Sequence, residues 1–329
     1  MTTAVLGTTV FFSWEVALME WLQSVLPGWS VPVISALSVF GEDLLLVAVT
    51  GFLYWSYNKE LGKTVGLSML SVNVWCPMIK NIFLRLRPYF VSDKINLLRK
   101  IDSSAEITDV AAQGYSFPSG HSANAVSVYG TFAAYIKKKW ALIPALLLPL
   151  LVGFSRVAVG AHFPTDVFAG WGIGVIAMIL IPFFRNKFNN KWIFSIILLV
   201  LALPGFFFCT STDFFSGYGM LLGFALAEPF EEKFVNFENT RSPIRAILRV
   251  LVGGALYFGL NTALKLPFPS AFLSSGTFAA NLVRMARYAV VIFIVIGVYP
   301  MLFKVTAKIG KKKTEQTVQA EQTEQTEDA

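Results

Sequence analysis

Apolar runs of membrane-spanning length recur along most of the chain and constrain its fold more than any other feature. Hydrophobic residues make up 55% of the 329 residues and charged residues only 14%, and the mean hydropathy is +0.61. This composition provides too little polar surface for a water-soluble globule of this size. Because a helix satisfies its own backbone hydrogen bonds in lipid, the runs predict an all-α, polytopic transmembrane helical bundle of about eight to ten spans.

Changes in composition along the chain predict four sections. We expect an N-terminal interfacial helix or short span in residues 1–29 and a core bundle, which carries the motifs described below, in 30–189. Additional C-terminal transmembrane helices are expected in 190–307. Residues 308–329 switch to a Thr-Glu-Gln composition that cannot bury a core, which predicts a disordered tail. The first residues lack the basic segment of a secretory signal, so we expect them to be mature protein.

The positions of Lys and Arg predict the orientation of the bundle. Basic connections at 59–63, 137–139, 185–191 and 233–241 all fall on one side, which the charge bias of insertion makes cytoplasmic, together with the C-terminus. We therefore expect an integral protein of a bacterial plasma membrane. The net charge of +7 is explained by this placement, and no nucleic-acid partner is expected. One outer region breaks the bias, and we interpret its Arg85, Lys94, Arg99 and Lys100 as lipid-headgroup contacts or an attracting rim.

The chain contains two histidines, His121 and His162, with two apolar runs at 123–136 and 140–154 between them. Two consecutive spans return the chain to the side that it left. The two imidazoles are therefore predicted to meet at one membrane face, the outer one, although they are distant in sequence.

Cations and a helix start in the same outer region predict a phosphate site. Lys80 and Arg87 are seven positions apart, so we expect one helix, ending at the proline after Arg87, to carry both on one face. Arg156 offers a planar fork of donors that matches phosphate oxygens. Ser119 and Gly120 can begin a helix whose free backbone N–H groups attract an anion.

The two histidines add the groups that phosphoryl transfer requires. His162 is the expected nucleophile, because a neutral imidazole can attack phosphorus. Asp166, four residues later, can hold the imidazole in the correct tautomer. His121 is expected to protonate the leaving alkoxide and later to activate water. Lys80, Arg87 and Arg156 would stabilise the transition-state charge, so we expect neither a metal nor another cofactor.

Three motifs in this order resemble the type 2 phosphatidic acid phosphatase superfamily. They are Lys80-x6-Arg87-Pro88, Pro118-Ser119-Gly120-His121 and Ser155-Arg156-x5-His162-x3-Asp166, without departure at any defining position. The resemblance covers roughly residues 40–185. It implies a helical-bundle lipid phosphatase with a phosphohistidine on His162, acid–base catalysis by His121 and no required metal, and it implies nothing specific about 190–329.

The expected function is hydrolysis of a phosphomonoester or diphosphate on an amphiphilic lipid at the extracytoplasmic face. The candidate substrates are a polyprenyl diphosphate, phosphatidate or a long-chain-base phosphate. A lipid phosphotransferase that uses the same site is an alternative, and a transporter or binding protein that holds a lipid phosphate is another. The sequence leaves the substrate and the oligomeric state open.

Ionisable residues in the C-terminal half are costly in lipid and are expected to have partners. Glu228 and Arg249 are predicted to form a structural ion pair. For Arg284 and Arg287, completion of the substrate-binding face and structural pairing both stay open. Cys76 and Cys209 have no metal-ligand spacing and are interpreted as packing residues.

Overall fold

The computed structural model describes residues 7–100 and 105–303, and these residues form helices without a β-strand. The predicted all-α transmembrane bundle is thereby confirmed, while the predicted tail at 308–329 lies outside the described residues. The α-helices are α1 (Ser13–Val25), α2 (Ser30–Leu37), α3 (Asp43–Phe52), α4 (Lys59–Phe83), α5 (Val110–Gln113), α6 (Gly120–Ala125), α7 (Thr131–Ile136), α8 (Lys139–Ala158), α9 (Pro164–Arg185), α10 (Trp192–Ala202), α11 (Thr212–Phe230), α12 (Pro243–Ala263), α13 (Ser270–Leu273) and α14 (Phe278–Ile292).

Tighter or wider helical turns extend several of these helices. The 3-10 segments are η1 (Ser38–Gly41), η3 (Pro88–Phe90) and η5 (Leu203–Phe207), and the π segments are η2 (Leu53–Tyr57), η4 (Val126–Gly130), η6 (Glu231–Val235) and η7 (Phe293–Val298).

Fewer helices are long and apolar enough to cross a membrane than the sequence suggested. Within the described residues four qualify, namely α8, α9, α12 and the continuous helix Phe278–Phe303, and a fifth is reached if the pair Ser30–Gly41 and Asp43–Tyr57, bent by 45°, counts as one broken span. Helix α4 has 25 residues but does not meet the requirement for length and hydropathy together. The count of spans therefore falls short of eight to ten by these criteria.

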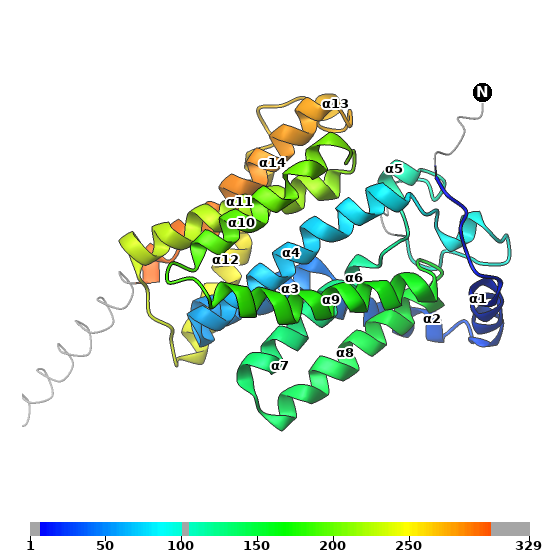
Figure 1. Ribbon diagram of the computed structural model, residues 1–329, viewed down its shortest axis with the longest axis horizontal. Helices are drawn as coiled ribbons and strands as arrows, with labels where there is room; N and C mark the ends of the chain where they lie inside the picture. The colour runs from blue at the N-terminus through cyan, green and yellow to red at the C-terminus, as the bar shows by residue number, and fades with distance from the viewer. Residues whose placement is uncertain (1–6, 101–104, 304–329) are drawn as a thin grey trace, which may run out of the picture.

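Helix α4 occupies the centre of the bundle. Figure 1 shows it between α9, on one side, and α10, α11 and α14 on the other, and it packs directly on α6, α9 and α11. Glycines allow the closest of these approaches: a Cβ at Gly217 of α11 would lie 2.1 Å from the carbonyl oxygen of Asn73 in α4. A Cβ at Gly219 would lie 2.2 Å from the carbonyl oxygen of Met285 in α14. Small residues bring membrane helices into backbone contact in this way, so the C-terminal helices are packed tightly on the core.

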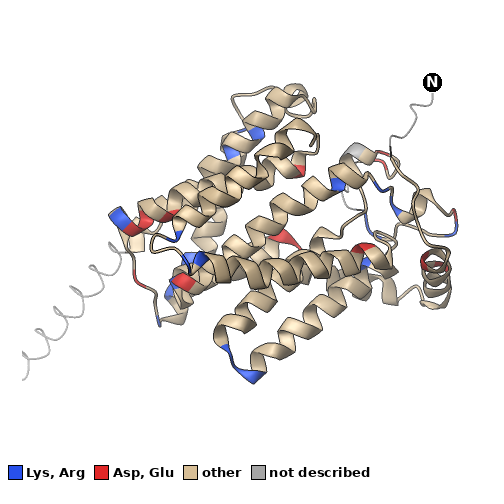
Figure 2. Ribbon diagram, in the orientation of Figure 1, with Lys and Arg blue, Asp and Glu red and all other residues tan. Residues whose placement is uncertain are grey.

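Charged residues gather toward the ends of the helices, whose middle parts are mostly uncharged (Figure 2). Near the N-terminal end of α4, the side chain of Lys63 is 1% exposed and its Nζ lies 2.8 Å from Glu232 and 3.4 Å from Glu231. Arg185, at the end of α9, pairs with Glu228 of α11. This buried ionic cluster links α4 and α9 of the core to the C-terminal helix α11 and its extension η6. Separation of these helices would leave buried charges without their partners, which is strongly destabilising.

The structure gives partners to the arginines of the C-terminal helices and surroundings to the two cysteines. The predicted pair of Glu228 with Arg249 is wrong: Arg249 instead donates to the backbone oxygens of Trp55 (2.5 Å) and Glu238 (3.0 Å). The reason is that Arg185 of α9, which is distant in sequence, forms the ion pair with Glu228 instead. Arg287 donates to Oδ1 of Asn261 at 2.9 Å. The two cysteines, Cys76 and Cys209, are free and buried, as expected of packing residues.

Candidate active site

The helix α4 ends earlier than the spacing of its cations suggested. Leu84 adopts a left-handed conformation (φ 50°), so the helix stops at Phe83 and Arg87 lies beyond it. The segment after the stop pairs with the N-terminal chain, where the backbone of Leu86 donates to that of Thr8 at 2.9 Å. The prediction that Lys80 and Arg87 share one helix face is therefore wrong. The two side chains nevertheless line the same cavity.

The polar cavity, as we name it, has a volume of about 520 Å³ and collects most of the predicted site. Lys80 and Arg87 line it together with both histidines of the chain, His121 and His162, and with Gly120. Gly120 and His121 are the first two residues of α6, and His162 lies between α8 and α9. The helical hairpin of α6–α7 and α8 thus returns the second histidine to the first, as the two apolar runs suggested.

His162 is buried, with 2% of its surface exposed, and its two ring nitrogens have different surroundings. Nε2 lies 3.4 Å from Nη1 of Arg87, and Nδ1 lies 3.6 Å from Oδ2 of Asp166. Burial is the main cause that lowers the pKa of His162 well below its ordinary value, and the neighbouring charges of Arg87, Lys80 and Arg156 lower this pKa further. The arrangement favours a neutral imidazole whose Nδ1 side faces the carboxylate and whose Nε2 side faces the cations.

Asp166 does not line the polar cavity, and several groups besides His162 bind its carboxylate. Oδ2 accepts from the hydroxyl of Ser116 and, at 2.8 Å, from the backbone N–H of Phe163. Oδ1 accepts from Nη1 of Arg85 at 2.6 Å. The carboxylate is thereby held rigidly beside the imidazole, at a separation slightly longer than a hydrogen bond.

Arg85 is a site residue whose role the sequence did not reveal. It was interpreted as a headgroup contact or a rim cation, but it is 7% exposed and links two buried carboxylates, Asp166 and, at 2.8 Å, Glu15 of α1. Glu15 in turn accepts from the hydroxyl and the backbone of Thr165, at 2.6 and 3.0 Å. That interpretation is therefore wrong. No local pattern signals the contact, because it joins segments far apart in sequence.

The remaining cations of this region differ from Arg85. Lys94 has 81% of its side chain exposed and lies 3.9 Å from Glu20. Arg99 is half-buried, pairs with Glu42 and donates to the backbone of Ser35. Lys100 is also exposed and donates to the backbone oxygen of Ala105 at 3.2 Å. Lys94 and Lys100 thus have the exposure of rim residues, whereas Arg99 does not.

The two catalytic-region cations use their donors differently. Arg87 donates to the backbone oxygens of Gln113 (2.7 Å), Gly114 (2.9 Å) and Ala161 (2.7 Å), and so ties the loop before α6 to the loop that carries His162. Lys80 donates to the backbone oxygen of Tyr115 at 2.8 Å. Because an ammonium group carries three donors, Lys80 retains the capacity to bind an anion in the cavity.

Ser119 and Arg156 are buried next to the polar cavity but are not among its lining residues. Ser119 caps α6, where its hydroxyl oxygen accepts from the backbone of Ser122 at 3.4 Å. Arg156 donates through Nη1 to Ser38 at 3.3 Å, while its Nε and Nη2 have no hydrogen-bond partner in the described structure. These two donors are therefore available to an acceptor that enters the site.

Acceptor side chains that were not predicted also line the polar cavity, namely Asp43, Asn73, Asn124 and Asp213. The available signal was that acidic side chains in or beside apolar runs are costly and mark functional positions. Among the described residues, no group of three or more His, Cys, Asp or Glu side chains meets in a way that could hold a metal ion.

Comparison with known proteins places these features in a family. The profile of the PAP2 superfamily matches residues 61–192, and the profile described as "PAP2 superfamily phosphatase, transmembrane extension" matches 215–312. Phosphatidylglycerophosphatase B of Bacillus subtilis is 39% identical over 183 residues, which are 52% of this chain and 78% of that enzyme.

An archaeal enzyme and a solved structure also match this chain. An undecaprenyl-diphosphatase of Sulfolobus acidocaldarius is 32% identical over 139 residues, or 42% of this chain; the match covers 62% of that enzyme, less than two thirds of its length. The crystal structure of a transmembrane PAP2-type phosphatidylglycerolphosphate phosphatase from Bacillus subtilis is 26% identical, with a TM-score of 0.45, and the match covers 54% of this chain and 87% of that one.

The resemblance carried by the three motifs is thus confirmed by whole-domain similarity. Both the profile match to the region of α4–α9 and the identity to the Bacillus subtilis enzyme exceed what the short motifs alone establish. The chain belongs to the PAP2 superfamily of membrane phosphatases and carries the transmembrane extension of that family.

Proposed function

We propose that this protein hydrolyses a phosphomonoester or diphosphate of an amphiphilic lipid through a phosphohistidine on His162. The observation that carries the proposal is the polar cavity, in which both histidines of the chain meet Lys80 and Arg87. The relatives named above are phosphatases of undecaprenyl diphosphate and of phosphatidylglycerophosphate, and they support a lipid substrate. Phosphatidate and a long-chain-base phosphate have the same reactive group and stay candidates.

The reaction divides into two displacements at phosphorus. In the first, the lone pair of Nε2 of His162 forms a bond to phosphorus while the bond from phosphorus to the ester oxygen breaks, and His121 gives its proton to the leaving oxygen. In the second, water attacks the phosphohistidine while His121 takes up its proton, the bond from phosphorus to Nε2 breaks, and inorganic phosphate leaves. Both histidines return to their starting protonation states.

Each of the surrounding groups has a proposed part in these steps. Asp166 stabilises the imidazolium character that develops on His162, since its Oδ2 lies on the Nδ1 side of the ring at 3.6 Å. Lys80, Arg87 and the unpaired donors of Arg156 attract the phosphoryl oxygens, with the backbone N–H of Gly120 at the start of α6. Ser119 supports this helix start as its cap, since its own backbone N–H donates to the backbone oxygen of Asp166 at 2.9 Å. Arg87 also keeps the His162 loop in place through Ala161.

The proposed orientation puts the polar cavity at the extracytoplasmic face of a bacterial plasma membrane and the C-terminus in the cytoplasm. The support is the helix geometry: α4, α6–α7, α8 and α9 each run between the cavity end and an opposite end where Lys63, Lys137–Lys139 and Arg185 lie. Basic residues concentrate on the cytoplasmic side of membrane proteins.

A phosphate-release assay in the presence of a chelator tests the function and the metal-free mechanism together. Purified protein in detergent is expected to release phosphate from lipid phosphates at an undiminished rate with excess EDTA, because Lys80, Arg87 and Arg156 supply positive charge at the reacting group. Loss of activity with EDTA, with recovery on addition of a divalent cation, would contradict the metal-free mechanism. Transfer of phosphate to an added alcohol in preference to water would instead identify a phosphotransferase, and binding without turnover a lipid-phosphate carrier.

The protonation of His162 can be measured directly. In the variant His121→Asn, expressed with a tag that contains no histidine, His162 is the remaining imidazole of the chain. NMR of carbon-labelled histidine is expected to give a titration midpoint below pH 6.5, because burial and nearby cations disfavour the imidazolium. The neutral, nucleophilic form is thus present above that midpoint and is lost as the pH falls through it. A midpoint at or above pH 6.5 would contradict a nucleophile that is neutral at physiological pH.

A further inference from the structure

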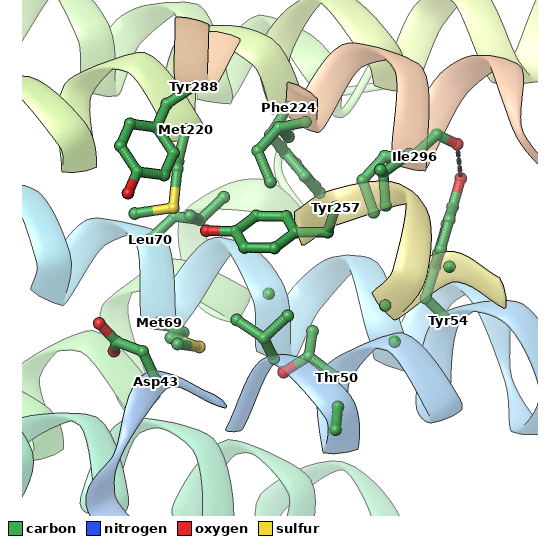
Figure 3. A pocket seen from close by; sticks show the side chains of 18 of the residues that line it. Asp43, Thr50, Tyr54, Met69, Leu70, Met220, Phe224, Tyr257, Tyr288 and Ile296 are labelled. Carbon is green, nitrogen blue, oxygen red and sulfur yellow. Dashed lines mark hydrogen bonds between the residues drawn. The ribbon is translucent and has the colours of Figure 1, made fainter. Parts of the chain in front are cut away.

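A second hollow, which we name the apolar groove, lies between the core and the C-terminal helices. It has a volume of about 280 Å³ and is lined by α3 and α4 on one side and by α11, α12 and α14 on the other. Figure 3 shows Leu70, Phe224 and Tyr257, from α4, α11 and α12, in this groove, with Asp43 toward one end and Tyr54 toward the other. This volume lies just below the roughly 300–1,000 Å³ typical of ligand sites, so the groove has room for part of one hydrocarbon chain.

The apolar groove is continuous with the polar cavity. The two hollows share the lining residues Asp43, Asn73, Asp213, Ser216 and Met220. The polar cavity contains the cations and histidines, and the groove contains mostly apolar and aromatic side chains. The environment thus changes from charged to polar to apolar along the two cavities. This order matches the phosphate, the linking group and the hydrocarbon chain of one lipid molecule.

The shared layer between the two hollows is rich in hydrogen-bond acceptors. Asp43 and Asp213 are accessible although they lie inside the bundle, so their carboxylates face the hollows. Asn124, which lines only the polar cavity, donates through Nδ2 to Asn73 (2.7 Å) and Asp43 (3.2 Å), and its buried Oδ1 has no partner in the described structure. Ionised carboxylates and amide oxygens only accept hydrogen bonds. A ligand that crosses this layer is therefore favoured if it brings a donor such as a hydroxyl or ammonium group.

We propose that the transmembrane extension forms the chain-binding half of the lipid site, with one hydrocarbon chain in the apolar groove and a donor group of the lipid bound by Asp43 and Asp213. This inference rests on the proposed function for the position of the phosphate. It gives the C-terminal helices a role in substrate selection: lipids with one chain in the groove and a hydroxyl or ammonium group beside the phosphate bind best. Arg284 is the one cation among the lining residues of the groove, and it lies on the wall contributed by α14.

Helix α12 is suited to admit a chain from the bilayer. Along its length only Ala246 and Gly253 are buried, so most of its surface faces outward. Two of its glycines offer a matched pair of substitutions, because a Cβ at Gly254 or at Gly259 meets no atom within 4 Å. Gly254 lines the apolar groove and Gly259 does not. A leucine at either position has the same effect on helix propensity, but only the leucine at 254 occupies the groove.

Photo-crosslinking tests the chain position without relying on turnover. The probe is a glycerol phosphate with one palmitoyl-length chain that carries a diazirine near its middle, bound to the His162→Ala variant in detergent. Crosslinks are expected on peptides of α11, α12 and α14, to be reduced several-fold by Gly254→Leu and unchanged by Gly259→Leu. Crosslinks confined to other helices, or equal crosslinking in both leucine variants, would overturn the proposal even in a protein without phosphatase activity.

Hydrolysis provides a second readout. The ratio of kcat/KM for palmitoyl glycerol phosphate to that for butanoyl glycerol phosphate is expected to fall about tenfold in Gly254→Leu, because roughly two methylene groups lose their burial, and to stay the same in Gly259→Leu. An unchanged ratio in an active protein would overturn the groove assignment. Failure of the unsubstituted protein to hydrolyse any lipid phosphate would instead count against the proposed function. The crosslinking result would still test whether the groove binds the hydrocarbon chain.

The acceptor layer predicts a preference among lipids of equal chain length. Palmitoyl glycerol phosphate, with a hydroxyl, and sphinganine phosphate, with an ammonium group, are expected to exceed hexadecyl phosphate in kcat/KM by about tenfold, the magnitude of a hydrogen bond to a charged group. Asp213→Asn should reduce this preference while the protein keeps its elution volume in gel filtration. Equal hydrolysis of all three lipids would overturn the role of Asp43 and Asp213, and the better of the first two identifies the donor.

Discussion

The variant His162→Ala is expected to lose phosphate release by a factor of about 10⁴ or more, the scale on which removal of a nucleophile lowers turnover in other hydrolases. The reason is that His162 lines the polar cavity with its Nε2 3.4 Å from Nη1 of Arg87, so that the attacking nitrogen lies beside the cation that would hold the phosphoryl group. The measurement is release of inorganic phosphate from a lipid phosphate by the purified variant. Activity equal to that of the unsubstituted protein would remove the nucleophile assignment.

A comparison with His121→Ala separates the two histidine roles. With a nitrophenyl phosphate, whose leaving group departs without a proton, His121→Ala is expected to form the phosphohistidine and to accumulate it, because activation of water is impaired. His162→Ala is expected to form none. Acid-labile labelling from a radioactive phosphoryl donor distinguishes the two, and labelling of His162→Ala would show that the covalent intermediate forms elsewhere.

The second large effect is expected for Arg85→Ala, through stability. Asp166 and Glu15 are both completely buried, and Arg85 lies 2.6 and 2.8 Å from them. Removal of one partner from a buried ion pair leaves an uncompensated charge and costs about 3–5 kcal/mol. The expected result is a markedly lower midpoint of thermal unfolding in detergent, accompanied by loss of activity because Asp166 is no longer held beside His162.

Two variants serve as controls for Arg85. Lys94→Ala removes an exposed cation of the same region, 3.9 Å from Glu20, and should change stability by less than about 0.5 kcal/mol. In the background of Arg85→Ala, the added change Glu15→Gln should restore part of the lost stability, because it removes one of the two uncompensated charges. If Arg85→Ala were as stable as Lys94→Ala, the ion-pair network would not stabilise the fold as described.

Local periodicity and motif spacing predicted part of the site correctly and part wrongly, for identifiable reasons. The convergence of His121 and His162 depends only on the parity of the spans between them, which hydropathy reveals. The relation of Lys80 to Arg87 depends on where α4 ends. That end is set by the left-handed Leu84 and by pairing with Thr8, a segment distant in sequence, so helical spacing misplaced it.

The sequence by itself determined the membrane-bound helical class and the family. It also identified the motif residues that meet at the polar cavity. Those features follow from composition and from the short spacings within each motif, and both can be recognised without knowing which distant segments are in contact. Only the tertiary structure decided that Arg85 joins Asp166 to Glu15, that Glu228 pairs with Arg185, and that the C-terminal helices close an apolar groove against α4. The physical reason is that a buried charge or a hollow is defined by what packs around it, and here those partners come from helices distant in the chain.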